Sequence, residues 1–112
     1  HGVDAIVVSN HGGRQLDGAP ATIDGISDIS KTVGRRAEIW LDSGIRSGQD
    51  IFKALALGAN GTMIGRAYQY GLGAMGKAGI SKCLEILRKE LDLTMGFCGA
   101  NEITDISKNN IL

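Results

Sequence analysis

Three short apolar runs alternate with helix-like segments along this chain, and that alternation limits the possible folds more than any other feature. The runs span residues 3–8, 38–41 and 62–64. Their nearly continuous apolar character is typical of strands buried on both faces of a parallel sheet. Between them, helical spacing of apolar residues predicts helices over residues 23–33 and about 48–57. The order predicts an α/β fold with parallel strands and right-handed crossovers.

The last third of the chain combines a glycine-rich segment with a long amphipathic pattern. Four glycines after the third strand predict breaks in a helix: Gly71, Gly73, Gly76 and Gly79. Apolar side chains at helical spacing then predict one buried face, made of Ile80, Leu84, Leu87, Leu91 and Met95. The polar tail from Asn101 predicts a short, loosely held turn.

Residues 71–76 also match the G-x-G-x-x-G pattern of dinucleotide-binding loops, and Asp92 lies about 20 residues further on, as that fingerprint asks. The pattern should directly follow a strand, whereas residues 66–70 look helical. Asp92 falls inside the amphipathic segment rather than at the end of a second strand. Close helix packing or a helix break therefore explains these glycines better than dinucleotide binding.

The chain is short for a complete fold of this class. A βα repeat needs about 30 residues, so 112 residues hold only two or three repeats. The sequence starts at His1 without an initiator methionine, and its first strand begins almost at once. We therefore expect residues 1–112 to be one portion of a larger domain, with no linker inside it.

Charge and cysteine usage exclude several classes of partner. Basic and acidic residues number 12 each, which gives a formal net charge of zero. No basic stripe exists for nucleic acid, and no polybasic segment exists for an anionic membrane. No apolar run approaches the roughly 20 residues of a membrane span. Cys83 and Cys98 form no Cys-x-x-Cys pair, so we expect reduced thiols in a cytosolic protein.

The segment Ser9-Asn10-His11-Gly12-Gly13-Arg14-Gln15-Leu16-Asp17 directly follows the first strand. A histidine changes charge near neutral pH and suits a general base. The planar fork of Arg14 can meet a carboxylate through two parallel hydrogen bonds. A lone loop histidine is more often structural or solvated, but a place beside Arg14 at a strand's carboxyl end favours catalysis by His11. We expect no metal site, because His1 lies at the other end of the strand.

Two more loops are candidates for phosphate binding. Asp42-Ser43-Gly44-Ile45-Arg46 follows the second strand, Gly65-Arg66 follows the third, and each opens onto a helix N-terminus. Free backbone N–H groups, a helix dipole and an arginine suit a phosphate dianion, and (β/α)8 barrels build such a site from two consecutive loops. Asp42 suits the hydroxyl groups of a ligand instead. The alternative is that the glycines only make tight turns and the arginines face water.

Read together, these residues resemble the FMN-dependent α-hydroxy-acid dehydrogenase and oxidase family. The resemblance is carried, in order, by residues 9–17, 42–46, 54–59 (Ala-Leu-Ala-Leu-Gly-Ala) and 64–66 (Ile-Gly-Arg). It implies a TIM (β/α)8 barrel. Residues 1–112 would then be the C-terminal portion of that single domain, about the last three βα units plus the C-terminal helix.

The resemblance also implies roles for individual residues. His11 is the base that takes a proton from the substrate's α-carbon or hydroxyl, Arg14 binds the substrate carboxylate, and Ser9 touches the flavin. The ribityl chain and phosphate of the cofactor FMN are held by Asp42, Ser43, Gly44, Ile45, Arg46, Gly65 and Arg66. The implied reaction is oxidation of an L-2-hydroxy acid, foremost L-lactate to pyruvate, with a quinone, a cytochrome or O2 as electron acceptor.

One departure from the family pattern refines this expectation. Ser43 stands where many members carry glycine, which resembles the bacterial respiratory L-lactate dehydrogenases and the mandelate dehydrogenases. This favours a dehydrogenase that passes electrons to a quinone chain. The family resemblance also implies a homo-oligomer when full length, in the cytoplasm or on the cytoplasmic face of the inner membrane. The family's flavin-contacting lysine, substrate-binding tyrosines and histidine-partnering aspartate lie upstream, so we expect the isolated chain to be inactive. The alternatives are glycolate or mandelate oxidation, a flavin-free isomerase using His11, and a non-catalytic half-barrel.

Overall fold

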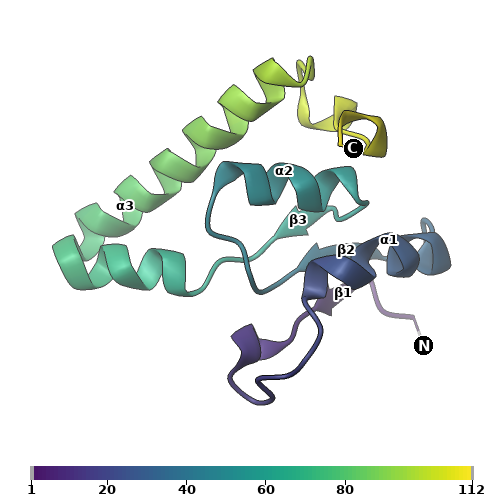
Figure 1. Ribbon diagram of the computed structural model, residues 1–112, viewed down its shortest axis with the longest axis horizontal. Coiled ribbons are helices and arrows are strands. Elements are labelled where there is room, and N and C mark those ends of the chain that lie inside the picture. Colours follow the sequence, from purple (N-terminus) through teal and green to yellow (C-terminus); the bar gives the residue numbers. More distant parts are fainter. Residues whose placement is uncertain (1, 112) are drawn as a thin grey trace.

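The computed structural model describes residues 2–111; His1, one of the two histidines considered above, lies outside them. Three strands form one parallel sheet in the order β1-β2-β3, with helices between and after them (Figure 1). The elements are β1 (Ala5–Val8), η1 (His11–Gly13), α1 (Thr22–Val33), β2 (Glu38–Leu41), α2 (Gly48–Ala56), β3 (Gly61–Thr62), α3 (Arg66–Phe97), η2 (Ile103–Asp105) and η3 (Lys108–Asn110). The predicted α/β class with parallel strands is confirmed.

The helix boundaries follow the local sequence signals. α1 ends at Gly34, whose φ of 60° is favourable only without a side chain. α2 begins at a capping box, in which the Ser47 hydroxyl accepts from the Asp50 N–H and the Asp50 carboxylate accepts from the Ser47 N–H. Gly58, with φ 108°, follows its last turn.

The core lies on one face of the sheet. Ile39 and Leu41 of β2 are buried there against Ile26 of α1 and Ala54 of α2. The expectation that the strands are buried on both faces is wrong for the described residues: on the opposite face, Val7 remains 53% exposed. Both helices pack on the same side of β2, so nothing among residues 2–111 covers the other side.

α3 is bent in its first half, where it changes direction (Figure 1). Met75 (φ −142°) and Gly76 (φ 58°) leave the helical conformation and divide α3 into two arms. The arms touch backbone to backbone: a Cβ placed on Gly79 would lie 1.8 Å from the carbonyl oxygen of Gly71. The glycine-rich pattern is therefore a helix bend and a packing contact within α3. The expected breaks at Gly71, Gly73 and Gly79 are absent, because the bend at Gly76 alone turns the chain.

The second arm of α3 packs on α2 along most of the predicted face. Leu87 and Met95 are buried and Leu91 is partly buried, as expected, whereas Leu84 is 52% exposed. α3 approaches the start of α2 closely: a Cβ on Gly48 would lie 2.1 Å from the Leu91 nitrogen. Glu90 then accepts a hydrogen bond from the Gly48 N–H at 2.8 Å.

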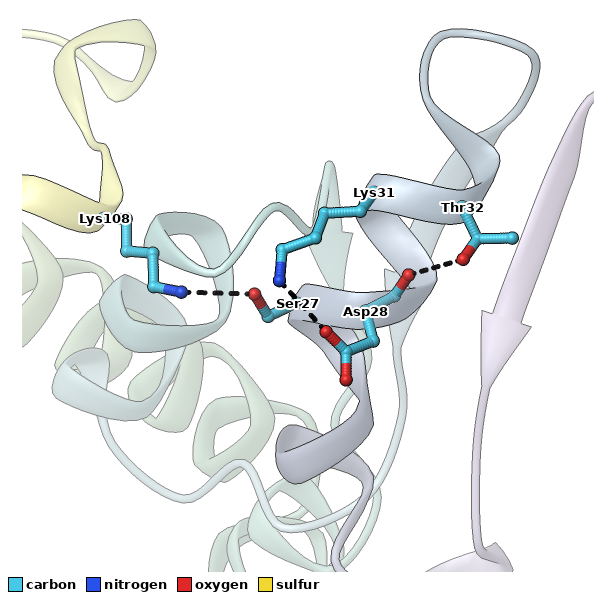
Figure 2. A network of polar contacts seen from close by, with 5 residues as sticks. All are labelled: Ser27, Asp28, Lys31, Thr32 and Lys108. Carbon is cyan, nitrogen blue, oxygen red and sulfur yellow. Dashed lines mark hydrogen bonds and ion pairs between the residues drawn. The ribbon is translucent and has the colours of Figure 1, made fainter.

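The tail after α3 is packed rather than loosely held. Ile106 is buried in a cluster with Phe52 of α2 and Met95 of α3. Figure 2 shows the tail near α1, where the Lys108 ammonium donates to the Ser27 hydroxyl at 3.4 Å. The neighbouring ion pair on α1, between Lys31 and Asp28, is solvent-exposed, and such pairs contribute little to stability. Within residues 2–111, no helix is long and apolar enough to cross a membrane.

Candidate active site

The loops that follow β1, β2 and β3 meet at one edge of the sheet. Parallel strands bring all their carboxyl ends to the same edge, where α/β proteins bind ligands. A cavity of about 280 Å3 opens there. It is lined by His11, Gly12, Arg14, Asp42, Ser43, Gly44, Ile45, Arg46, Met63, Gly65, Arg66, Ala67 and Gln69. Every predicted site residue except Ser9 therefore lines the same cavity.

The turn that carries His11 has an unusual backbone. Residues 11, 12 and 13 all have positive φ, at 55°, 67° and 74°. Glycine adopts this left-handed conformation without penalty, but His11 does not. The side chain of Asn10 closes the turn by accepting from the Gly12 N–H at 3.0 Å and donating to the Pro20 carbonyl at 3.1 Å. Asn10 is not among the predicted site residues, although an asparagine just before a glycine turn is a recognisable signal.

Two serines link the His11 turn to Asp42. The Ser9 hydroxyl donates to Asp42 Oδ2 at 2.5 Å and accepts from the His11 N–H at 3.0 Å. The Ser43 hydroxyl donates to the same oxygen at 3.1 Å and accepts from the Gly12 N–H at 2.9 Å. Ser9 therefore does not line the cavity itself but contacts Asp42, which does.

Positive charge dominates the cavity wall. Arg14, Arg46 and Arg66 come from three different loops, against the single carboxylate of Asp42. Arg66 links the loop after β3 to the loop after β1, because its Nη2 donates to the Gly12 carbonyl at 2.9 Å. In the part of the chain that the structure describes, no group of three or more His, Cys, Asp or Glu side chains could hold a metal ion.

The two helix N-termini near the cavity differ, which corrects one expectation. At α2, the Ser47 N–H donates to Asp50, and the Gly48 N–H donates to Glu90. The carboxylates of Asp50 and Glu90 thus occupy backbone N–H groups that the sequence predicts to be free for a phosphate. At α3, the N-cap Gly65 makes no side-chain hydrogen bond, and Gly65, Arg66 and Ala67 line the cavity. Of these two helices, α3 is therefore the one whose N-terminus is not occupied by a carboxylate and can meet an anion.

The donor set fits part of an FMN molecule. A phosphate matches the arginines and the α3 N-terminus, and ribityl hydroxyls match the carboxylate of Asp42. The cavity volume of about 280 Å3 lies just below the roughly 300–1,000 Å3 of complete small-molecule sites. These residues can therefore hold the polar end of such a cofactor, while its ring system needs further walls.

Comparison with known proteins agrees with this description. The model of the family described as FMN-dependent dehydrogenase matches residues 1–112. The chain is 48% identical over 110 residues to a peroxisomal (S)-2-hydroxyacid oxidase of Arabidopsis thaliana, covering 98% of this chain and 30% of the relative. It is 50% identical over 106 residues to an L-lactate oxidase of a Nostoc strain, covering 95% and 29%. The chain thus spans about 30% of the length of these relatives.

Solved structures of flavin-dependent 2-hydroxy-acid enzymes also match this chain. The monotopic membrane protein (S)-mandelate dehydrogenase superimposes with a TM-score of 0.95 at 40% identity, over 99% of this chain and 29% of that one. The predicted fold, part of a (β/α)8 barrel, is confirmed.

Proposed function

Because the chain belongs to the FMN-dependent dehydrogenase family, we propose that the protein containing it oxidises an L-2-hydroxy acid to the 2-oxo acid. The observation that carries the proposal is the shared cavity. It brings His11 and Arg14 together with the phosphate-binding candidates Arg46 and Arg66. We place residues 1–112 in the C-terminal portion of a single barrel domain.

The chain's own residues supply binding and proton transfer. Arg14 holds the substrate carboxylate through its guanidinium, and this orients the carbon that carries the hydroxyl. His11 accepts a proton from that carbon or from its hydroxyl as general base. Arg46, Arg66 and the α3 N-terminus hold the cofactor phosphate, and Asp42 binds the ribityl hydroxyls. Bound FMN supplies the two-electron acceptor.

L-lactate is the substrate we expect first, with pyruvate as product. The 50% identity to an L-lactate oxidase supports it. Identities of 47% to a glycolate oxidase of Spinacia oleracea and 40% to a mandelate dehydrogenase keep glycolate and mandelate as alternatives. The full-length protein should be yellow, and its flavin absorbance should bleach anaerobically on addition of L-lactate. A colourless protein contradicts the proposed function, and bleaching only by glycolate or mandelate reassigns the substrate.

The partners follow from the same reaction. The two electrons removed from the substrate need a final acceptor, for which we expect a quinone, a cytochrome or O2, and we expect the full-length protein to be a homo-oligomer. We place it in the cytoplasm or on the cytoplasmic face of the inner membrane. One relative is peroxisomal and one solved structure is a monotopic membrane protein, so fractionation of cells that express the full-length protein tests this placement.

The isolated 112-residue chain should not bind FMN tightly. Its cavity lacks walls for the flavin ring, and the exposed sheet face around Val7 admits water. We expect a dissociation constant weaker than about 1 µM, measured by quenching of FMN fluorescence, and no turnover of L-lactate. Binding tighter than this limit contradicts the prediction.

Replacing Arg66 with alanine in the full-length protein should weaken FMN binding roughly ten- to hundred-fold. The substitution removes a charge-assisted contact to the phosphate and the hydrogen bond to Gly12. Titration of the apoprotein with FMN measures the change. Arg35→Ala is the matched control, because Arg35 lies at the opposite end of the sheet, beside Gly34 and Glu38. Equal affinity of the Arg66→Ala and Arg35→Ala variants contradicts the assignment.

A further inference from the structure

Ser43 adopts a backbone conformation that favours glycine. Its φ is 86°, and His11 is the other described non-glycine residue with positive φ. A side chain held in this region costs conformational free energy, so such outliers point to a constraint from their surroundings. The Ser43 carbonyl accepts from the hydroxyl of Thr22, a buried residue at the start of α1, at 3.3 Å. This contact holds Ser43 in place next to the cavity.

The hydroxyl of Ser43 makes two contacts that glycine cannot. It donates to Asp42 Oδ2 at 3.1 Å and accepts from the Gly12 N–H at 2.9 Å. The preceding N–H, that of His11, donates to the Ser9 hydroxyl, which donates to the same Asp42 oxygen. Two consecutive N–H groups of the His11 turn are thus tied, through two hydroxyls, to one carboxylate at the end of β2.

The Gly12 N–H has a second acceptor, and the difference between the two acceptors is informative. Asn10 Oδ1 lies 3.0 Å from the same nitrogen. Asn10 belongs to the turn itself, so its contact closes the turn without fixing where the turn lies. Ser43 comes from a different loop, 31 residues along the chain, and its contact, together with that of Arg66 to the Gly12 carbonyl, fixes the turn relative to the cavity. Loss of the hydroxyl should therefore leave the turn folded but less firmly placed.

We propose that Ser43 is a positioning residue, whose hydroxyl ties the left-handed His11 turn to the loop after β2 and so places the His11 imidazole for proton transfer. This rests on the proposed function, in which His11 is the base. Small displacements of a catalytic group lower the rate of the chemical step more than they change substrate binding. Ser43 thus affects the rate through His11.

Two variants of the full-length holoenzyme separate the hydroxyl from the backbone. Ser43→Ala removes the hydroxyl and keeps a side chain at φ 86°, whereas Ser43→Gly removes the hydroxyl and relieves the strain. We expect the limiting rate of flavin reduction by L-lactate to fall about ten-fold in both variants. The substrate concentration for half-maximal rate should stay unchanged, with both variants saturated with FMN for the measurement. Hydrogen–deuterium exchange of a peptide spanning residues 9–14 should become faster in both.

Three results would overturn the proposal. The first is a limiting rate within about two-fold of the parent in both variants. The second is a slower Ser43→Ala beside a normal Ser43→Gly, which would assign the effect to backbone strain. The third is weaker FMN binding with an unchanged limiting rate, which would make Ser43 a cofactor ligand only. If no 2-hydroxy acid reduces the flavin of the parent enzyme, the proposed function fails. Unchanged hydrogen–deuterium exchange of residues 9–14 would separately contradict the contact between the two loops.

Discussion

Replacement of His11 with asparagine in the full-length protein should slow flavin reduction by L-lactate by roughly 10²- to 10⁴-fold, the usual contribution of a general base. Asparagine is the informative substitution because it tolerates positive φ better than most residues, and His11 has φ 55°. The turn should therefore keep its conformation while it loses the imidazole. Anaerobic rapid mixing of the holoenzyme with L-lactate measures the rate.

FMN content provides the control for this experiment. The assigned phosphate and ribityl contacts come from the loops after β2 and β3, so His11→Asn should bind FMN like the parent. Lys31→Ala, on the exposed surface of α1, should match the parent in both rate and FMN content. If His11→Asn is reduced at the parental rate, another group is the base.

Replacement of Gly79 with alanine should destabilise the protein more than any surface substitution. The new Cβ would lie 1.8 Å from the carbonyl oxygen of Gly71, which is backbone and cannot rotate away. The two arms of α3 would have to separate, at a cost of about 3 kcal/mol or more. The higher helix propensity of alanine offsets only about 1 kcal/mol of this. A lower midpoint of thermal unfolding measures the effect.

Gly73→Ala is the matched control within the same glycine-rich segment. Gly73 lies in the first arm of α3, before the bend, and a Cβ placed on it meets no atom within 4 Å. Alanine there should leave the unfolding midpoint unchanged or raise it, since glycine inside a helix costs about 0.5–1 kcal/mol relative to alanine. Equal midpoints for Gly79→Ala and Gly73→Ala would show that the arms do not pack as closely as described.

Most of the fold was predictable because its signals are local. The strand at Glu38–Leu41 and the helix that begins at Gly48 were predictable from adjacent residues. The extent of the contact face of α3 was not, since five apolar residues at helical spacing predict a face but not how much of it a neighbour covers. Leu84 belongs to the predicted face and is 52% exposed.

The candidate site divides in the same way. Nine of the ten site residues predicted from the sequence line one cavity, because parallel strands bring their carboxyl ends together. It did not reveal that Asp50 and Glu90 occupy the N-terminus of α2. The catalytic role of His11 and the cofactor contacts stay predictions until the variants are measured.

By itself, the sequence determined the class of the fold, the order of its elements and which loops meet at the cavity, because periodicity, caps and glycine turns act over a few residues. Only the tertiary structure decided which donors remain free and how the His11 turn is held. Those outcomes depend on hydrogen bonds between loops that come from different strands, such as Gly12 to Ser43 and Arg66 to Gly12. A hydrogen bond needs its two atoms within about 3 Å, and no local pattern specifies such a distance between segments distant in the chain.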